Sequence, residues 1–181
     1  RGLIDTSAWN TNYGQVNVTT ANKGTLRQLV LQGTTMNSNN YTSSSWSAYQ
    51  TQLRAAAQKL GNPVSSDVDT SALTSARDAL QTTVTLNANG GTIGTTSFNQ
   101  TVGAASTYNY PVSSYVPTRT GYTFKGWSTS QTAASGSTST VSAGLKPTLY
   151  AVWEANKYTV VFDNLIDFSK WNTTSASNGI I

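Results

Sequence analysis

Apolar residues across residues 19–81 recur with the spacing of amphipathic helices. Leu26, Leu29 and Val30 would share one face of a first helix, which Gly33 is expected to weaken because glycine is a poor helix former. Thr42 is placed to cap a second helix, and Gly61-Asn62-Pro63 would end it. The apolar stripe of that helix consists of Trp46, Tyr49, Leu53, Ala56, Ala57 and Leu60.

A third helix is expected directly afterwards. Ser65 or Ser66 would cap it, and Asp67 and Asp69 would lie in its first turn, where the helix dipole favours negative charge. Its inward-facing residues are expected to be Val68, Ala72, Ala76 and Leu80. Three short amphipathic helices joined by short turns predict an antiparallel bundle.

The pattern then changes to the two-residue alternation of strands. Val84 and Leu86 alternate with polar residues until Asn89-Gly90-Gly91 breaks the strand. Aromatic and polar residues alternate again through Gly121-Tyr122-Thr123-Phe124-Lys125-Gly126-Trp127. We expect a loop over residues 128–142 and a last strand over residues 148–153. The fold class is therefore α+β, with a three-helix bundle followed by a β-rich module.

Composition removes most catalytic chemistry. The 181 residues include no Cys and no His, so the commonest general base, the commonest metal ligand and the thiol nucleophile are missing. The net charge is +4, but the 11 Lys and Arg are scattered singly, whereas nucleic-acid binding needs them clustered. No apolar run is long enough for a membrane helix, so we expect no direct membrane insertion and no nucleic-acid partner.

The few acidic residues offer weak candidates for a site. Asp67-Val68-Asp69 could begin a calcium loop, but the further ligands and the glycine of such a loop are missing, so helix-start carboxylates are the favoured interpretation. A two-carboxylate glycosidase site cannot be assembled from the acids that the pattern places. A Lys157 crosslink to Asn164, with Glu154 nearby, is a third candidate. We predict no catalytic residue, no cofactor and no metal site.

Aromatic residues are the remaining candidates for binding. Their alternation favours a role in the core, rather than in a sugar-stacking platform, for Tyr122, Phe124, Trp127, Tyr150 and Trp153. Exposed surface or glycan contacts are predicted instead for a loop-like segment that contains Tyr108, Tyr110 and Tyr115.

The helical segment resembles the FIVAR module of bacterial surface proteins. Its second helix opens with the family's Tyr-Thr-x-x-Ser-Trp pattern, at Tyr41, Thr42, Ser45 and Trp46. The third helix resembles the family through Asp67, Val68, Ala72, Leu73, Ala76 and Leu80. This copy has fewer charged residues than is usual in the family, and the resemblance implies no catalytic residue.

The strand-rich segment closely resembles the Listeria-Bacteroides repeat, also called the internalin B-repeat. TLNANGG, PTRTGYTFKGW and TLYAVW carry the resemblance over about seventy residues. The structural motif residues are Gly90, Gly91, Gly121, Tyr122, Phe124, Gly126, Trp127, Tyr150 and Trp153. The resemblance implies a β-grasp-like module of the kind found in secreted and surface-displayed proteins.

The two ends of the chain share a motif. LIDTSAWNT at residues 3–11 and LIDFSKWNT at residues 165–173 both fit L-I-D-x-S-x-W-N-T, which indicates either a shared joint at module entries or the start of a further, jelly-roll-like domain. Asn156-Lys157-Tyr158 begins like a second repeat, and Leu165-Ile166-Asp167 then departs from it. We therefore expect a lead-in at residues 1–18, the bundle at 19–81, the β module at 82–155, and a connector with the start of a possible further domain at 156–181.

These features predict a non-enzymatic extracellular protein, structural or adhesive. It would be a stalk segment of a bacterial cell-surface adhesin or of a bacteriophage appendage such as a head fibre, capsid decoration or tail adhesin. Its expected partners are other virion or cell-surface proteins, or cell-envelope glycans, and a virion component could form a homo-oligomer. The alternative is an accessory or carbohydrate-binding fragment of a larger glycan-active enzyme.

Overall fold

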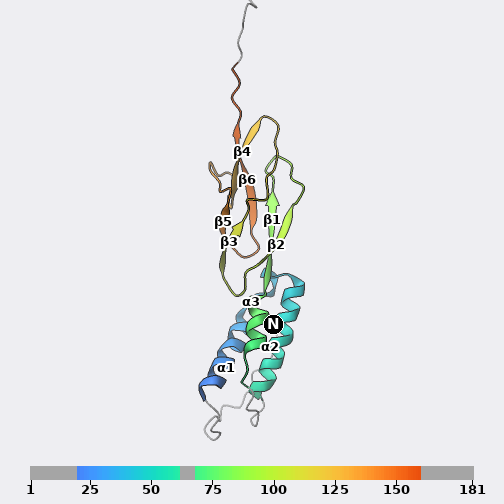
Figure 1. Cartoon of the computed structure of the whole chain (residues 1–181), viewed down its shortest axis with the longest axis vertical. Coiled ribbons are helices and arrows are strands. Elements are labelled where there is room, and N and C mark those ends of the chain that lie inside the picture. The colour runs from blue at the N-terminus through green and yellow to red at the C-terminus, as the bar shows by residue number, and fades with distance from the viewer. Residues whose placement is uncertain (1–19, 62–67, 160–181) are drawn as a thin grey trace, which may run out of the picture.

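The computed structural model describes residues 20–61 and 68–159 and begins with a bundle of helices. The helical elements are α1 (Thr20–Thr35), the short 3-10 helix η1 (Ser38–Asn40), α2 (Ser43–Gly61) and α3 (Ser71–Asp78). Figure 1 shows that α1, α2 and α3 run alternately up and down beside one another. The predicted antiparallel three-helix arrangement is confirmed.

The bundle has its own apolar core. It is formed by the buried side chains of Leu26, Val30, Tyr49, Leu53, Ala56, Leu60, Leu73 and Leu80. Gly33 was expected to weaken the first helix, but α1 continues through it to Thr35. A Cβ at Gly33 would lie 2.6 Å from Leu53 Cδ1 and 2.6 Å from the Tyr49 hydroxyl oxygen. Gly33 is therefore the position at which α1 approaches α2 closely enough for these side chains to pack.

Helix α2 starts where the sequence predicted, but α3 starts later than predicted. Thr42 precedes α2, and its carbonyl accepts the Trp46 N–H at 3.0 Å. Helix α3 begins only at Ser71, because the Asp69 carboxylate accepts the Ser71 N–H at 2.9 Å and holds the chain in a turn before the helix. The expectation that Ala72 faces inward is wrong: Ala72 is exposed and Leu73 is buried. The predicted caps Ser65 and Ser66, and Asp67, lie outside the described residues.

The second part of the chain is built from strands. They are β1 (Gln81–Asn87), β2 (Ser97–Thr101), β3 (Thr107–Pro111), β4 (Tyr122–Ser128), β5 (Thr140–Gly144) and β6 (Thr148–Ala155). Four of them form a mixed sheet in the order β2-β1-β6-β4, in which β1 and β6 are parallel and the outer pairs are antiparallel. The fold is thus α+β in two parts.

The two remaining strands, β3 and β5, form an antiparallel ribbon. It packs against the sheet, as shown by one core cluster that joins Tyr110, Val112 and Val141 of this region to Val84, Leu86, Trp127 and Leu149 of the sheet. Two expectations are wrong here. Tyr108 and Tyr110 lie on strand β3 and not in a loop, and β5 begins inside the segment that was expected to be a loop over residues 128–142.

Strand β4 contains a bulge that explains its aromatic pattern. Phe124 pairs with Trp153 and Gly126 pairs with Val152, so Lys125 is the extra residue. Gly126 adopts φ +118°, a conformation that side-chain-bearing residues rarely adopt. The bulge turns Trp127 towards the same core as Phe124, although their odd spacing would place them on opposite faces of a regular strand.

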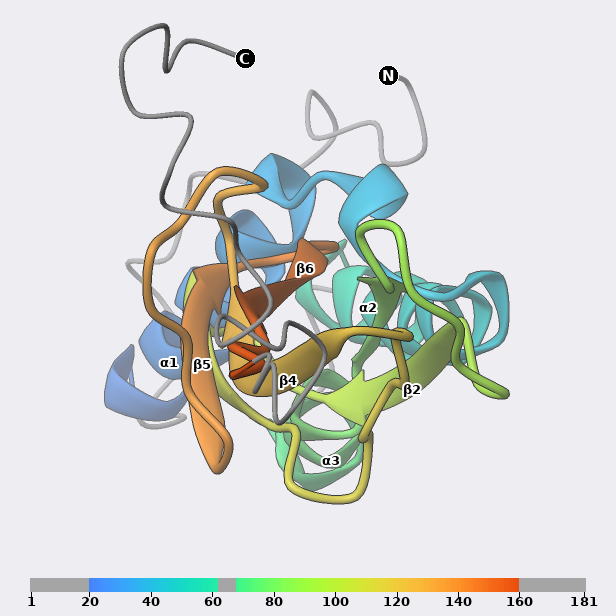
Figure 2. The same cartoon turned by 90° about the horizontal axis from the view of Figure 1, so that it is seen from above.

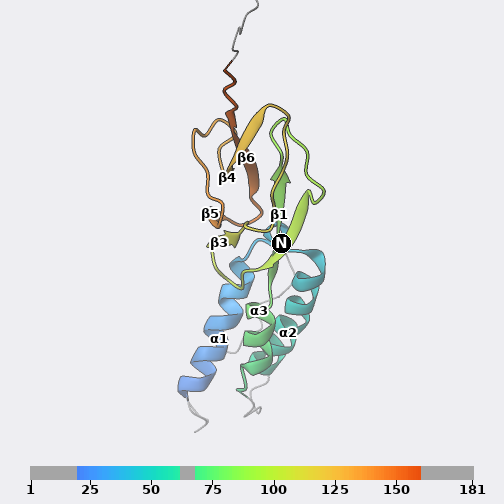
Figure 3. The same cartoon turned by 45° about the horizontal axis from the view of Figure 1, so that its top comes forward.

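The two parts lie end to end. In Figures 1 and 3 the helices occupy one end of the molecule and the strands the other, and α3 leads directly into β1. Figure 2 looks along the long axis and shows the strands above the ends of the helices. The expected lead-in at residues 1–18, both copies of the L-I-D-x-S-x-W-N-T motif, and the departure at Leu165 lie outside the described residues.

Candidate functional site

The helices and the sheet meet without a linker. Helix α3 ends at Asp78 and strand β1 begins at Gln81. Leu80, which lies between them, is fully buried in the core of the bundle. Its carbonyl accepts hydrogen bonds from Val102 N–H at 2.9 Å and Gly103 N–H at 3.1 Å, both of which follow β2. A residue of the helical core is therefore tied directly to the β part.

The first residue of β1 is bound to the N-terminal turn of α2. The Gln81 carbonyl accepts the Thr42 N–H at 2.7 Å. The Gln81 N–H donates to the Ser45 hydroxyl at 3.0 Å. Both backbone groups of Gln81 are thus used to hold the strand against the helix, in addition to the covalent connection through α3.

Thr82 bridges three separate segments. Its side chain is 0% exposed. The hydroxyl donates to the Asn40 carbonyl in η1 at 2.7 Å and accepts the Lys146 N–H from the turn between β5 and β6 at 2.8 Å. The buried hydroxyl of Thr82 is therefore satisfied both as a donor and as an acceptor. These two hydrogen bonds fix the orientation of the side chain.

Tyr41 completes the contact between the two parts. It packs against the apolar cores of both the bundle and the β module. Its ring stacks on Trp46 with centroids 5.6 Å apart and planes 9° apart. Burial raises the pKa of the Tyr41 hydroxyl above its ordinary value of 10.0. We call this region the joint and define it as Asn40, Tyr41, Thr42, Ser45, Leu80, Gln81, Thr82 and Lys146.

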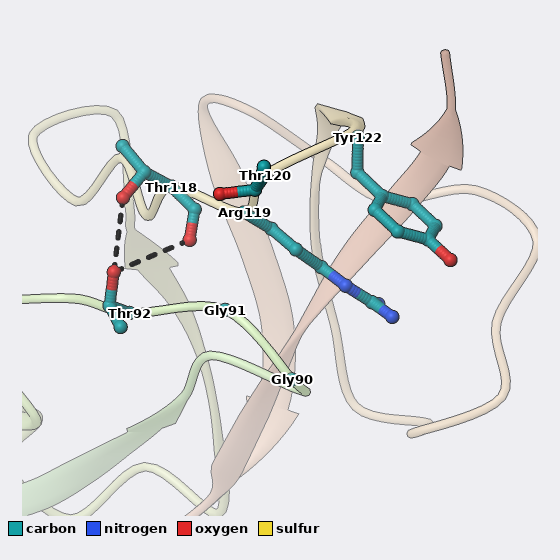
Figure 4. Close-up of a pocket in the computed structure, with 7 residues that line it drawn as sticks. All are labelled: Gly90, Gly91, Thr92, Thr118, Arg119, Thr120 and Tyr122. Carbon is teal, nitrogen blue, oxygen red and sulfur yellow. Dashed lines mark hydrogen bonds between the residues drawn. The ribbon is translucent and has the colours of Figure 1, made fainter. Parts of the chain in front are cut away.

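A shallow hollow lies at the other end of the β module, beyond the end of β1 (Figure 4). We call it the distal depression; its volume is about 640 Å³, and it is lined by Gly90, Gly91, Thr92, Thr118, Arg119, Thr120 and Tyr122. Thr92 and Thr118 hold its two loops together through reciprocal backbone hydrogen bonds of 2.8 and 2.9 Å. Their hydroxyls lie 3.1 Å apart.

Arg119 is the cation of the distal depression. Its Cζ lies 3.7 Å from the centre of the Tyr122 ring, and its Nη1 donates to the Asn89 carbonyl at 3.3 Å. Figure 4 shows the side chain extended between the Gly90 turn and Tyr122. Gly91 lets the loops approach, because a Cβ there would lie 2.5 Å from the Thr118 carbonyl oxygen and 2.6 Å from Trp153 Cζ2.

The three tyrosines predicted to make surface contacts differ in exposure. Tyr110 is fully buried and its hydroxyl donates to the Gly144 carbonyl at 2.9 Å, so the expectation that it is exposed is wrong. Tyr108 is half-buried, with its ring 5.5 Å from that of Tyr110. Tyr115 is half-buried and stacks on Phe98 at 4.6 Å. Glycan contacts through Tyr108 and Tyr115 stay a prediction.

The aromatic residues of the repeat-like motif lie mainly in the core. Trp127 is 1% exposed and donates its indole N–H to the Tyr115 carbonyl at 2.7 Å. Phe124 and Trp153 are half-buried and pack against this core, and the Trp153 indole donates to the Ala88 carbonyl at 2.9 Å. Tyr150 is half-buried but does not belong to this cluster, because Leu149 and Ala151 are the residues of β6 that face inward, so the expectation of a core role for Tyr150 is wrong. Tyr122 differs from the expectation, since it is 37% exposed and lines the distal depression. Gly121 adopts φ +78° in the turn just before it.

Acidic side chains do not converge on a site in the described part of the chain. Glu154 pairs with Lys125 at 3.0 Å and Asp78 pairs with Arg77 at 2.9 Å, both near the surface. Among residues 20–61 and 68–159, no group of three or more His, Cys, Asp or Glu side chains could hold a metal ion. Asp67 and Asn164, which belong to two of the candidates considered above, lie outside these ranges.

Two residues of these sites were not anticipated from the sequence. Thr82 falls in the inward register of Val84 and Leu86, so a polar residue at a buried position directly after a helix was the available signal. The signal for Arg119 was weaker: it is a single basic residue two positions before Gly121, the glycine that precedes an aromatic strand.

The helices in the described ranges include none with the length and hydropathy needed to span a membrane. No curated protein and no solved structure matches the chain. The three helices are present, but the comparison with family models gave no FIVAR match.

A family model does match the β part. The matched segment contains the strands from β1 to most of β6, the bulge of β4 and the loops of the distal depression. It excludes the helices and most of the joint. Residues 83–152 match the model of the Listeria-Bacteroides repeat domain.

Proposed function

We propose that this chain is a non-catalytic, extracellular structural segment that acts as a rigid spacer. It would serve in a bacterial cell-surface adhesin or in a phage appendage such as a head fibre, capsid decoration or tail adhesin. The observation that supports the proposal is the joint, in which a helical bundle and a repeat-like β module are fastened end to end.

The joint favours rigidity for energetic reasons. Each protein hydrogen bond contributes roughly 1 kcal/mol net, but a buried polar group left without a partner costs roughly 1–3 kcal/mol. Bending the molecule at the joint would break the bond of Thr82 to Asn40 and the backbone bonds of Gln81 to the start of α2. It would also separate Tyr41 from one of the two cores. These losses occur together, so a bent state is disfavoured by several kcal/mol.

The family match supports a modular setting. A Listeria-Bacteroides repeat domain is typical of non-catalytic modules of surface proteins. A helical bundle placed directly before it extends the molecule along one axis (Figure 1). In the proposed role the partners are neighbouring virion or cell-surface proteins, or cell-envelope glycans at the far end of a longer assembly.

The proposal is tested by a distance measurement across the joint. Because the chain has no Cys, Gln58→Cys in α2 and Ala155→Cys at the end of β6 allow two spin labels to be placed on exposed positions. Pulsed electron paramagnetic resonance should give one narrow distance distribution. Thr82→Val removes the bridging hydroxyl without changing the side-chain shape, and it should broaden that distribution.

The matched control is Thr83→Val. The Thr83 hydroxyl donates to Asn99 Oδ1 at 2.9 Å within the sheet, away from the joint, so this variant should keep the narrow distribution. A broad distribution in the parent chain, or equal broadening in the two valine variants, would count against a rigid spacer.

A further inference from the structure

The distal depression contains a cation that is held in place and has unused donors. The Arg119 guanidinium lies over the Tyr122 ring, with Cζ 3.7 Å from the ring centre. Gly90 leaves room for it, because a Cβ at that position would approach Cζ to 3.3 Å. One of its nitrogens donates to the Asn89 carbonyl. A guanidinium has five N–H donors, so most remain available to a ligand.

No acidic side chain in the described part of the chain neutralises this cation. The lining residues include none, and Arg119 forms no ion pair with any residue of the described ranges. Ordering a flexible arginine before binding removes part of the entropy cost that a ligand would otherwise meet. The site is therefore prepared for an anion that accepts two parallel hydrogen bonds, which is the geometry of a carboxylate or a phosphate.

The rest of the lining indicates what carries the anion. Thr92, Thr118 and Thr120 are exposed and bring hydroxyls to the rim, and Tyr122 adds a partly exposed aromatic ring. Hydroxyls that donate and accept, together with an aromatic edge, complement the hydroxyl groups and C–H surfaces of a sugar. The volume of about 640 Å³ falls in the range of small-ligand sites.

We propose that the distal depression binds an acidic saccharide, with Arg119 pairing with the carboxylate of a uronic acid unit. The Thr hydroxyls and Tyr122 contact the sugar hydroxyls and ring. This site does not depend on the rigidity of the joint, since all of its residues belong to the β module.

The proposal is tested by titrating the isotope-labelled full chain and following its amide NMR signals. Tri-galacturonic acid should shift the signals of Gly90, Gly91 and Arg119 saturably below about 10 mM, while the neutral trisaccharide maltotriose should not. Arg119→Gln should weaken binding by at least about tenfold, because the paired charge is lost. The control Lys125→Gln removes one exposed positive charge from β4 outside the depression and should leave binding nearly unchanged.

Further arms identify the ligand chemistry. Arg119→Lys keeps the positive charge but cannot form two parallel hydrogen bonds with the carboxylate, so it should bind several-fold more weakly than the parent chain. If Arg119→Gln does not fold, Arg119→Lys takes its place as the test of the site. Glycerol phosphate and tri-glutamate should bind more weakly than tri-galacturonic acid. Equal or tighter binding of either would overturn the saccharide assignment. Absence of saturable shifts with tri-galacturonic acid, or unchanged binding in Arg119→Gln, would overturn the site itself.

Discussion

Asn89 shows how one side chain fixes the turn that supports the distal depression. Its backbone adopts φ +48°, which asparagine tolerates better than most residues. Its side-chain Nδ2 donates to the carbonyls of Gln131 and Ala151, both at 3.0 Å. The amide thus connects the loop after β1 to β6 and to the loop after β4, while the Asn89 carbonyl receives Arg119.

Asn89→Asp should destabilise the protein by about 2–4 kcal/mol, because a carboxylate oxygen would replace the donor and face two carbonyl oxygens. The free energy of unfolding, measured by urea denaturation, checks this value. Asn87→Asp is the control, since Asn87 Oδ1 accepts the Asn89 N–H at 2.8 Å and a carboxylate can do the same. Equal losses in the two variants would show that charge alone, and not the donor at Asn89, is responsible.

At the scale of elements, the sequence predicted the parts with a regular period. The stripe of α2 and the alternation of β1 were confirmed, because burial on one face repeats every 3.6 or 2 residues. Strands β3 and β5 were missed because each has only two inward-facing residues, and so short an alternation is hard to distinguish from a loop. The face to which Trp127 points depends on the bulge in β4, which the alternation of the sequence does not predict. Gly126 is needed beside the bulge because a Cβ there would meet the backbone of Gly136 and Ser137 within 3 Å.

The candidate sites were predicted less well for a related reason. The joint brings together Asn40, Thr82 and Lys146, which are far apart in the sequence. The hydrophobic periodicity of a single helix or strand does not predict contacts between such distant segments. Tyr122 was expected in the core because it shares the alternation of Phe124, but it is the first residue of β4 and lies outside the buried part of that strand. Tertiary position decides its exposure.

Gly33 provides a prediction about helix packing. Gly33→Ala should lower the free energy of unfolding by about 1–3 kcal/mol, because the added methyl group meets Leu53 and Tyr49 within 3 Å. Gly24→Ala, in the same helix with nothing within 4 Å of the added atom, should instead stabilise by about 0.5–1 kcal/mol. Thermal denaturation of both variants checks the pair; stabilisation by both would show that α1 and α2 are not in close contact at Gly33.

The described part of the molecule is elongated and has two apolar cores, and Tyr41 packs against both of them. The bundle and the β module each enclose their own buried cluster, and Tyr41 is the half-buried side chain that packs against both. Separate cores would allow two independent domains, and the hydrogen bonds of Gln81 and Thr82 are what oppose this independence. The joint therefore decides whether the chain behaves as one body or as two.

The most direct test of this claim is the relative orientation of the two parts in solution. Residual dipolar couplings of amides in α1–α3 and in β1–β6 should fit a single alignment tensor, with the same magnitude and axes for both sets. Two tensors of different magnitude, one for the helices and one for the strands, would show that the parts move independently and would contradict the rigid spacer.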